Sequence, residues 1–586
     1  MSSPLEGGLK SVLQIFGFGA ELSVLTPRVD LLQQTRYALA IGGMLCLSFL
    51  YLLVGFNQDP NGFTYDEGIT VYGATNILNG ELPYRDFWTI YAPGQFYLLA
   101  GLFKVTGASI LAERVWSVLV NCLLGFVVYL TGRKFLGAPY ALLAWGLAVI
   151  WLGSFRFHAS PLPPALLFSL MSCFCLVNFL AGKGRHWLFL SGFLVGVAGL
   201  FRHDLGAYTL LAGLTTAGLA HLTTPVRQRQ RNFNKLTGLL SLSALFIGGA
   251  TLVLAPVLVY FLSVTPPEEL GYNLITFPLT IFPKYRSLPY PWPLLSLELV
   301  THREVSIFDY VKTTIRNFLF VWPLVIGAVT FILVIRQFGR RKEDITKSLS
   351  YWSMLLFALL SVMFLNQARI RSDVYHLLPV YLPASLLFCL FLSYISQLGK
   401  FRPAAWLMAG LIGLAIIVDP LQAKVDRFTE AVQASPTDIF DLERAKGLAY
   451  PNKADYQAAI DYIRRTVKPD EKIFVGNTRH DKIFSNDIMF YFLANRQSAT
   501  KYYELHPGLA TTAPIQQTII NDLEQTGVKT IVLFHEADPQ EPNASSESSQ
   551  VFLLDAFIQG RFSQVRQFGS YTILERKAGY VSTERP

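Results

Sequence analysis

Two adjacent carboxylates, Asp66 and Glu67, lie in the segment Phe63-Thr64-Tyr65-Asp66-Glu67-Gly68, shortly after a long apolar run. A carboxylate in this position can take a proton from a hydroxyl group, or hold a divalent cation against a phosphate that leaves. The alternative is a solvated acidic start to an amphipathic helix, because Asp and Glu favour helix N-termini. Both readings stay open here, and we predict Asp66 and Glu67 as catalytic candidates.

Two basic clusters interrupt other apolar runs. Arg202-His203-Asp204 divides what would otherwise be one long run, and a polar segment from Asn366 to His376 separates two more. Charges at membrane depth are costly and usually line a cavity. Arginine suits a phosphate because its guanidinium offers paired hydrogen bonds. The alternative for each cluster is a polar turn between two hairpinned helices.

A loop rich in aromatic residues and proline runs from Phe277 to Arg286 and continues to Pro293. Such a loop can cover an apolar lipid tail, while Lys284 and Arg286 contact its phosphate. An interfacial aromatic belt is the alternative. We interpret Glu113-Arg114 as a local pair and His158 as a structural residue.

Long apolar runs must position these residues. The 586-residue chain is 52% hydrophobic and only 15% charged, against roughly 25% charged in average soluble proteins. Runs near the roughly 20 residues that span a bilayer predict a multi-pass membrane protein with about 11 spans. The predicted spans are Tyr37–Phe56, Ser109–Leu130, Ala138–Phe155, Ala165–Ala181, Trp187–Phe201, Leu205–Ala220, Leu236–Ser263, Phe318–Ile335, Leu349–Leu365, Leu377–Ile395 and Ala404–Val418.

The net charge of +9 follows the predicted topology. With a cytoplasmic N-terminus, the inside segments hold 18 Lys and Arg against five Asp and Glu, whereas the outside segments before the C-terminal region hold 12 against 14. The positive-inside rule selects this orientation, so the charge gives no support to a nucleic-acid partner. All five cysteines lie in apolar runs, which predicts neither a disulfide framework nor a zinc site.

The composition changes after residue 420. Alternating patterns predict helices at Asp455–Val467, Ile515–Gln525 and Phe552–Ile558, and strands at Lys472–Val475, Thr530–Phe534 and Tyr571–Glu575. We therefore expect a small extracytoplasmic α/β domain over residues 421–586. The sequon Asn543-Ala544-Ser545 is a weak glycosylation signal. The remaining domains are a cytoplasmic segment, 1–36, and a transmembrane domain, 37–420, with long outer loops at 57–108 and 264–317.

The first loop resembles that of the integral-membrane glycosyltransferases of the C-type fold, in the bacterial branch similar to aminoarabinose transferase and the protein mannosyltransferases. Asp66-Glu67, the stretch from Ile77 to Phe87 and Tyr91-Ala92-Pro93-Gly94 carry the resemblance, which extends over residues 37–419. It implies a mostly α, polytopic helical bundle. It also implies transfer of a hexosyl or pentosyl group from a polyprenyl-phosphate donor to a cell-envelope glycan, lipid or protein acceptor.

The same resemblance implies roles for single residues, at the outer face of the cell (inner) membrane. Asp66 would be the catalytic base or a cation ligand, supported by Glu67. No cofactor is identified, although a divalent cation, Mg²⁺ or Mn²⁺, is a candidate. The expected contacts to the donor phosphate and sugar are Arg85, Asp86, Tyr91, Arg202, His203, Asp204, Lys284, Arg286, Arg369, Arg371, Asp373 and His376. The C-terminal region has no nucleotide-binding Gly-rich turn, in keeping with a donor carried on a membrane lipid.

Two other function classes compete with this hypothesis. A transporter or lipid flippase should carry charges near span centres and matched broken helices, and the sequence shows neither. A non-enzymatic assembly protein would act through its C-terminal domain. Deletion of Gln422–Pro586 is expected to separate a scaffold from a transferase.

Overall fold

The computed structural model describes residues 31–58, 63–156, 158–223, 235–291, 306–338, 345–395, 399, 402–450, 453–535 and 540–577. Most of the predicted N-terminal segment 1–36, several of the predicted cytoplasmic basic residues and residues 292–305 of the second long loop lie outside these ranges. The chain divides into two compact units, residues 1–51 and 52–586. The described part of the first unit belongs to helix α3 (Leu31–Leu53). The remaining loops, the C-terminal sheet and the helices that pack on them belong to the second unit.

Each predicted apolar run corresponds to one apolar helix in the described part of the chain. Eight of these helices are long and apolar enough to cross a membrane, and three are shorter. They are α3, α6 (Ile110–Gly132), α7 (Ala138–Ser154), α8 (Leu162–Leu180), α9 (His186–Phe201), α10 (His203–Thr223), α11 (Lys235–Val264), α15 (Ile307–Phe338), α16 (Ile345–Ile370), α17 (Leu378–Ile395) and α18 (Arg402–Gln433). The chain is thus a multi-pass membrane protein, and α18 continues past the predicted end of the last span at Val418.

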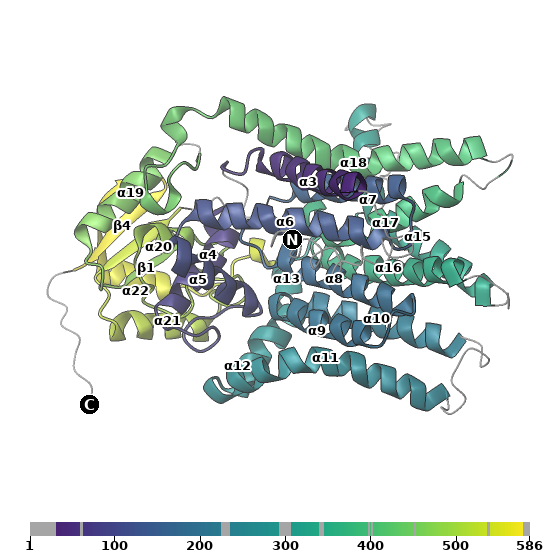
Figure 1. Cartoon of the computed structure of the whole chain (residues 1–586). Coiled ribbons are helices and arrows are strands. Elements are labelled where there is room, and N and C mark those ends of the chain that lie inside the picture. Colours follow the sequence, from purple (N-terminus) through teal and green to yellow (C-terminus); the bar gives the residue numbers. More distant parts are fainter. Residues whose placement is uncertain are drawn as a thin grey trace, which may run out of the picture. The chain divides into compact units, whose positions relative to one another are not determined.

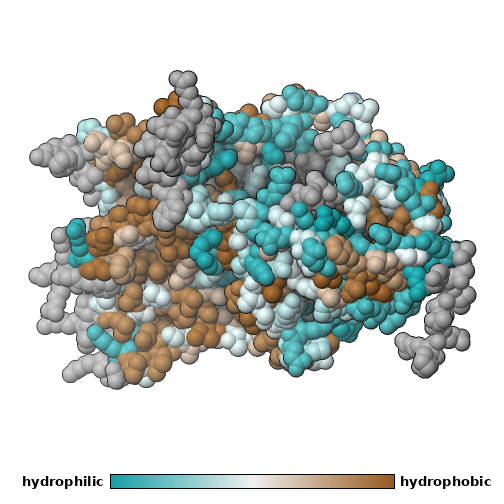
Figure 2. Space-filling model, turned by 180° about the vertical axis from the view of Figure 1, so that it is seen from behind, coloured by the Kyte–Doolittle hydropathy of each residue, from teal (hydrophilic) through white to brown (hydrophobic). Residues whose placement is uncertain are grey.

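Burial separates inner from outer helices in the second unit. α8 and α17 are mostly buried among other helices, whereas α11 and α18 leave most of their apolar residues exposed. In water such exposed leucines would be unfavourable, so these faces are suited to lipid. Figure 2 shows hydrophobic side chains gathered over one half of the face in view and hydrophilic side chains over most of the other half.

The C-terminal region forms the predicted α/β domain. Its four-stranded sheet has the order β1-β2-β4-β3, with β1 (Ile473–Asn477) parallel to β2 (Thr530–Phe534). β4 (Tyr571–Arg576) pairs antiparallel with both β2 and β3 (Phe562–Phe568). The helices of this region are α19 (Lys453–Thr466), α20 (Met489–Ala494), α21 (Ala513–Gln525) and α22 (Leu553–Arg561). The six elements predicted from the sequence are confirmed, and β3 and α20 are additions.

The first long loop is mostly helical and shares one hydrophobic core with this domain. It contains α4 (Gly68–Leu78) and α5 (Gly94–Thr106), which lie beside the C-terminal sheet and its helices in Figure 1. Tyr72 of α4 stacks on Tyr491 of α20 at 5.1 Å between ring centroids, and Phe63 stacks on Phe440 at 6.5 Å. The loop and the C-terminal domain therefore fold as one body.

Candidate active site

A cavity of about 480 Å³ lies where this body meets the ends of the apolar helices. Six separate parts of the chain contribute charged or polar side chains to its lining. They are the first loop, the turn between α7 and α8, the turn between α9 and α10, α13 (Phe282–Arg286), the end of α16 with the segment that follows it, and the C-terminal domain. The side chains relevant to chemistry are Asp66, Tyr91, Arg202, Arg286, Gln367, Arg371, Asp373, His376, Glu504 and His506.

Local backbone structure fixes the position of Asp66. It lies in a single π-helical turn, Phe63–Glu67, directly before α4, and π-helical turns are frequent at functional sites. Gly68 follows, and a Cβ atom there would lie 2.7 Å from the backbone nitrogen of Met489. Only glycine permits this close approach of α20 to the turn that carries Asp66.

A second glycine of the first-loop motif has a similar role. A Cβ atom on Gly94 would lie 2.6 Å from the carbonyl oxygen of Leu200, near the end of α9. This contact brings the motif Tyr91-Ala92-Pro93-Gly94 against the turn that carries Arg202. Tyr91 and Arg202 both line the cavity as a result.

The Asp66 carboxylate faces the cavity without a fixed partner. It is half-buried, and it accepts no hydrogen bond from the residues that the structure describes. Burial raises the pKa of Asp66 above its ordinary value, although the charges of Arg286, Arg371 and His376 act in the opposite direction. An unpaired carboxylate with a raised pKa is suited to accept a proton.

Two arginines bring positive charge to the same cavity. The buried Arg286 donates to the carbonyl oxygen of Phe484 at 3.1 Å and lies over the Phe484 ring at 4.5 Å. Among the described residues it has no carboxylate within ion-pair distance. Arg371 is held by Glu541 through two hydrogen bonds of 2.6 and 3.0 Å. Arg286 is therefore the cation with most of its donors available to an anion.

The Arg202 cluster is ordered internally. The Arg202 guanidinium donates to both carboxylate oxygens of Asp204, at 3.1 and 2.8 Å, and Gln367 also donates to Asp204 at 2.8 Å. Arg202 and Gln367 line the cavity, whereas Asp204 holds them from behind. Because one carboxylate fixes both Arg202 and Gln367, this segment is an ordered cluster and not only a polar turn between helices.

Asp373 and His376 form a second ordered pair. The Asp373 carboxylate caps the 3₁₀ turn Val374–Leu377 and lies 2.7 Å from Nδ1 of His376. Burial alone would raise the pKa of Asp373, but His376 and Arg371 beside it hold that pKa below the ordinary value. Asp373 therefore stays ionised and orients the imidazole towards the cavity.

Glu67 lies outside the cavity, unlike its neighbour. Its two carboxylate oxygens accept hydrogen bonds from Nε and Nη2 of Arg114 at 2.9 and 2.8 Å, and both side chains are almost fully buried. Arg114 also donates to the carbonyl oxygens of Phe56 and Gln58. The partner of Arg114 is thus Glu67 rather than Glu113, which instead accepts from Ser117 and the backbone of Ala159. This geometry gives Glu67 a structural role.

Other predicted residues are also separate from the cavity lining. Arg85 and Asp86 pair with each other at 2.7 Å on a different surface. Arg369 donates to Asn366 at 3.0 Å, and Lys284 lies 5.5 Å from the ring of Tyr285. Of the fourteen predicted site residues, the cavity lining includes seven; the others are Glu67, Arg85, Asp86, His203, Asp204, Lys284 and Arg369.

Sequence reasoning missed the contribution of the C-terminal domain. Glu504 is almost fully buried, lines the cavity, and has one carboxylate oxygen without a partner among the described residues. Burial raises the pKa of Glu504 well above its ordinary value and lowers that of the neighbouring His506 to about 3. Both residues lie in Tyr502-Tyr503-Glu504-Leu505-His506-Pro507-Gly508, whose mixture of aromatic residues, charges and a Pro-Gly turn was the available signal.

The described residues contain no group of three or more His, Cys, Asp or Glu side chains that could hold a metal ion. The side chain of Asn543, in the weak sequon, is half-buried and donates to the carbonyl oxygen of Ser287 at 2.9 Å.

Residues 91–262 match the family model described as dolichyl-phosphate-mannose-protein mannosyltransferase. The fold is similar to that of ArnT from Cupriavidus metallidurans in the apo state, with a TM-score of 0.50 and 12% sequence identity over 93% of this chain and 99% of that chain. No curated protein sequence matches the chain.

Two further structures are similar at lower TM-scores. ArnT from Cupriavidus metallidurans bound to undecaprenyl phosphate gives a TM-score of 0.48 and 13% identity over 93% of this chain and 99% of that chain. The archaeal oligosaccharyltransferase AglB from Archaeoglobus fulgidus gives 0.45 and 12% over 93% and 75%. The predicted resemblance is confirmed at the level of fold: this chain is a polytopic membrane protein with the C-type fold of the integral-membrane glycosyltransferases.

Proposed function

We propose that this protein transfers a sugar from a polyprenyl-phosphate donor to a hydroxyl group of a cell-envelope acceptor. The proposal rests on one cavity that holds both a carboxylate and a guanidinium group, each without an ion-pair partner among the described residues. Asp66 is a carboxylate without a hydrogen-bond partner among the described residues, and it faces Arg286, which has no carboxylate partner among them. The family model that matches residues 91–262 is named for transfer of mannose from dolichyl phosphate to protein.

The reaction needs a base and a phosphate clamp. The acceptor oxygen attacks the anomeric carbon as the bond from that carbon to the phosphate oxygen breaks. Asp66 takes the acceptor proton, and the polyprenyl phosphate leaves with the electron pair of the broken bond. Arg286 and Arg371 stabilise the charge that develops on the leaving phosphate, and fixed cations in a partly closed cavity do this without reorganisation. Direct displacement inverts the configuration at the anomeric carbon.

Apolar residues of the same cavity supply a surface for the lipid tail of the donor. Phe155, Leu162, Phe282 and Leu288 lie in the lining beside the charged groups. They provide a surface for the first units of a lipid tail, which continues along the exposed apolar helices. Positioning of both reactants contributes as much as the base, because fixed geometry removes the entropy cost of encounter.

Cation dependence remains a proposal. Mg²⁺ commonly binds one or two carboxylates together with substrate phosphates, so Asp66 and oxygens of the donor would be its ligands here. No step above depends on it. Turnover in the presence of EDTA, with and without added Mg²⁺ or Mn²⁺, tests the requirement directly.

The membrane and the orientation are also proposals. The excess of Lys and Arg in the segments predicted to face the cytoplasm supports a cytoplasmic N-terminus in the cell (inner) membrane, with the cavity on the outer side. Alkylation of single cysteines introduced at exposed sites such as Glu443, by a reagent that cannot cross the membrane, tests the orientation.

The decisive experiment is a donor panel with purified full-length protein. Polyprenyl phosphates carrying hexoses, pentoses and amino sugars are incubated with a cell-envelope extract as acceptor source, and release of polyprenyl phosphate is measured. We expect one sugar class to be released with dependence on Asp66. No release from any donor, or equal release by the Asp66→Asn protein, would contradict the proposal.

The transporter or flippase alternative predicts a different outcome. Proteoliposomes would then move a labelled donor lipid or solute across the membrane, with dependence on Arg202 or Asp373 and without release of polyprenyl phosphate. Deletion of Gln422–Pro586 cannot distinguish a scaffold from a transferase, because it would remove Glu504 from the cavity and more than half of the shared core. Single substitutions in the cavity are the appropriate test.

A further inference from the structure

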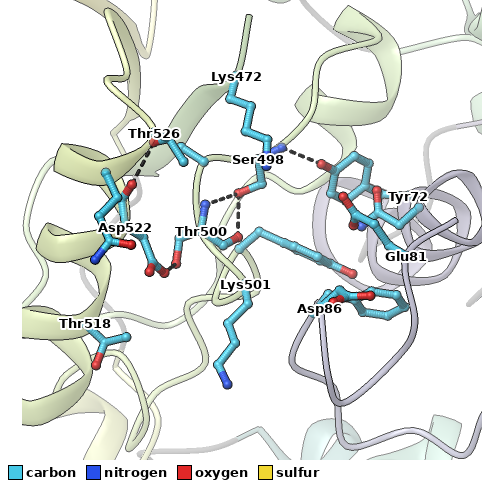
Figure 3. Close-up of a pocket in the computed structure, with 15 residues that line it drawn as sticks. Tyr72, Glu81, Asp86, Lys472, Ser498, Thr500, Lys501, Thr518, Asp522 and Thr526 are labelled. Atoms are coloured by element: carbon cyan, nitrogen blue, oxygen red, sulfur yellow. Dashed lines mark hydrogen bonds between the residues drawn. The ribbon is translucent and has the colours of Figure 1, made fainter. Parts of the chain in front are cut away.

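A second cleft, of about 210 Å³, lies in the body formed by the first loop and the C-terminal domain, and it is separate from the cavity of Asp66. Its walls come from α4, from the turn after α4, from residues 498–503 and from α21. Figure 3 shows Ser498 and Thr500 between Tyr72 and Glu81 on one side and Asp522 on the other. Two distant parts of the chain thus build this cleft together.

The walls of the cleft are held in place by hydrogen bonds. Tyr72 accepts from the backbone nitrogen of Ser498 at 2.7 Å, and Thr500 donates to Asp522 at 2.7 Å. The backbone nitrogen of Trp88 donates to the carbonyl oxygen of Lys501 at 3.0 Å. A polar cleft whose walls are already ordered loses little entropy when a ligand binds.

Two buried polar atoms in the lining have no partner among the described residues. They are Oδ1 of Asn76 and the hydroxyl oxygen of Tyr503, and each side chain belongs to a residue that is only 1% exposed. Buried polar groups in folded proteins are nearly always hydrogen-bonded, so each of these atoms requires an explanation. A ligand or a bound water that offers hydrogen bonds in the cleft would satisfy both.

The lining selects the chemistry of that ligand. The lining contains the carboxylates of Glu81, Asp86 and Asp522 and the ammonium groups of Lys472 and Lys501. Asp86 pairs with Arg85, Lys501 pairs with Glu269, and Asp522 accepts from Thr500. Glu81 and Lys472 are therefore the acceptor and the donor without an ion-pair partner among the described residues. Three acids against two bases do not favour a phosphate, and the polar walls do not favour an apolar group. A metal ion is not supported either, because the described residues hold no cluster of three ligands. Closely spaced donors and acceptors match a polyol.

The size of the cleft limits the ligand further. Sites for drug-sized molecules have volumes of roughly 300–1,000 Å³, and this cleft is smaller. It suits one sugar ring rather than an extended chain. We infer that the cleft between α4 and α21 is a binding site for a single sugar unit of a glycan, outside the cavity where transfer is proposed.

Neighbouring residues of the chain line the cleft and the cavity. Tyr503 lines the cleft and the next residue, Glu504, lines the cavity. On α4, Asn76 lines the cleft and Ile69 lines the cavity. These two residues are seven positions apart, which is about 10 Å along a helix at 1.5 Å per residue. The cleft is thus close to the cavity, although different residues line it.

Photo-cross-linking tests the inference on the full-length protein. Diazirine-bearing mannose, glucose and N-acetylglucosamine are the probes, and labelled peptides are located by mass spectrometry. We expect label in residues 498–503 or 518–526 that an excess of the unmodified sugar removes. The Glu81→Gln and Tyr503→Phe proteins should each lose at least tenfold of this label, whereas Glu443→Gln, which changes an exposed carboxylate elsewhere, should keep it.

Two outcomes would overturn the inference. One is the absence of label from both segments with all three probes. The other is label that neither substitution reduces in proteins with unchanged thermal melting, which would indicate a water-filled cleft. Glu81 is only half-buried, so Glu81→Gln keeps the test valid if Tyr503→Phe impairs folding. Labelling needs neither donor lipid nor turnover, so failure here is distinguishable from failure of the proposed sugar transfer.

Discussion

Asp66 and Glu67 are neighbours in the chain, but their carboxylates lie in two regions with opposite properties. On one side of the π-helical turn, Asp66 faces a cavity in which Arg286 and Arg371 also lie, and no described residue donates a hydrogen bond to it. On the other side, Glu67 and Arg114 satisfy each other in an almost closed contact. Consecutive helical residues point in different directions, so one turn can serve both regions.

The difference shows how a structural charge can be told from a reactive one. A fully paired, buried carboxylate holds two parts of the chain together, and its burial keeps it out of reach of a substrate. A carboxylate with a raised pKa and cations nearby is able to act on one. Adjacent acidic residues in a sequence therefore do not imply a joint catalytic role.

The largest effect is expected for Asp66→Asn. Loss of a general base typically lowers the rate by roughly 10²–10⁴-fold, and folding should be unaffected because no described residue donates a hydrogen bond to this carboxylate. Polyprenyl phosphate release and thermal melting measure the two quantities. Asp470→Asn, at an exposed position, is the control. Full activity of the Asp66 variant would remove the distinction between the two regions.

Glu67→Gln should act on stability instead. It leaves the guanidinium of Arg114 buried without its counter-charge, and breaking a buried ion pair costs about 3–5 kcal/mol. Thermal or denaturant unfolding in detergent measures this cost. The matched control is Glu430→Gln, whose 3.6 Å pair with Arg156 is 45% exposed at the glutamate and is worth about 0–1 kcal/mol. An unchanged melting temperature with lost activity would instead assign Glu67 to catalysis.

Arg371→Gln tests how the charge of this arginine affects the pKa of Asp66. Arg371 lowers the pKa of Asp66 against the effect of burial, so its loss should raise that pKa further. Since the base must be ionised, the acidic limb of the pH–rate profile should move to higher pH. Hydrogen bonds to charged groups are worth about 1.5–3 kcal/mol, so turnover should also fall roughly 10–100-fold.

The neighbouring Arg369 provides the control for this prediction. Its guanidinium contacts Asn366 rather than the cavity, so Arg369→Gln should leave the acidic limb in place. A shift of the same size in both variants would indicate a general effect of surface charge. That result would argue against a specific contact between Arg371 and the charge of Asp66.

The smallest effect is expected for Glu541→Gln. Glu541 orients Arg371 from the C-terminal domain, and both side chains are 20% exposed, so the pair contributes about 1 kcal/mol or less. Turnover should change by about fivefold or less, with little change in the acidic limb. A loss as large as that of Arg371→Gln would show that the C-terminal contact, and not the arginine alone, builds the phosphate site.

The local sequence pattern was sufficient to predict most of the helices and strands. Periodicity and run length predicted the eleven long apolar runs and the helices and strands around β1, β2 and β4, because these segments carry their burial pattern in neighbouring residues. β3 was missed since nearly all of its residues are exposed at the sheet edge, which leaves no alternation. α20 has only six residues and is buried throughout, so a helical period cannot be recognised.

The candidate site was predictable only in part. Residue type and position near helix ends indicated Asp66, Arg202, Arg286 and Arg371, because charges beside apolar runs are unusual enough to be informative. The pairing of Glu67 with Arg114 could not be predicted, since an alternative partner, Glu113, lies next to that arginine in the sequence. The separation of Arg85 and Asp86 from the cavity likewise depends on how the first loop folds.

The sequence by itself determined that the chain crosses a membrane many times, where its charges concentrate, and that an α/β domain follows. These properties depend on composition and on residues close together in the chain. Only the tertiary structure decided which of two adjacent carboxylates faces the cavity, and that Glu504 and His506 complete its lining. Side-chain direction and long-range packing set both results, because the first loop and the C-terminal domain bury their apolar residues in one shared core.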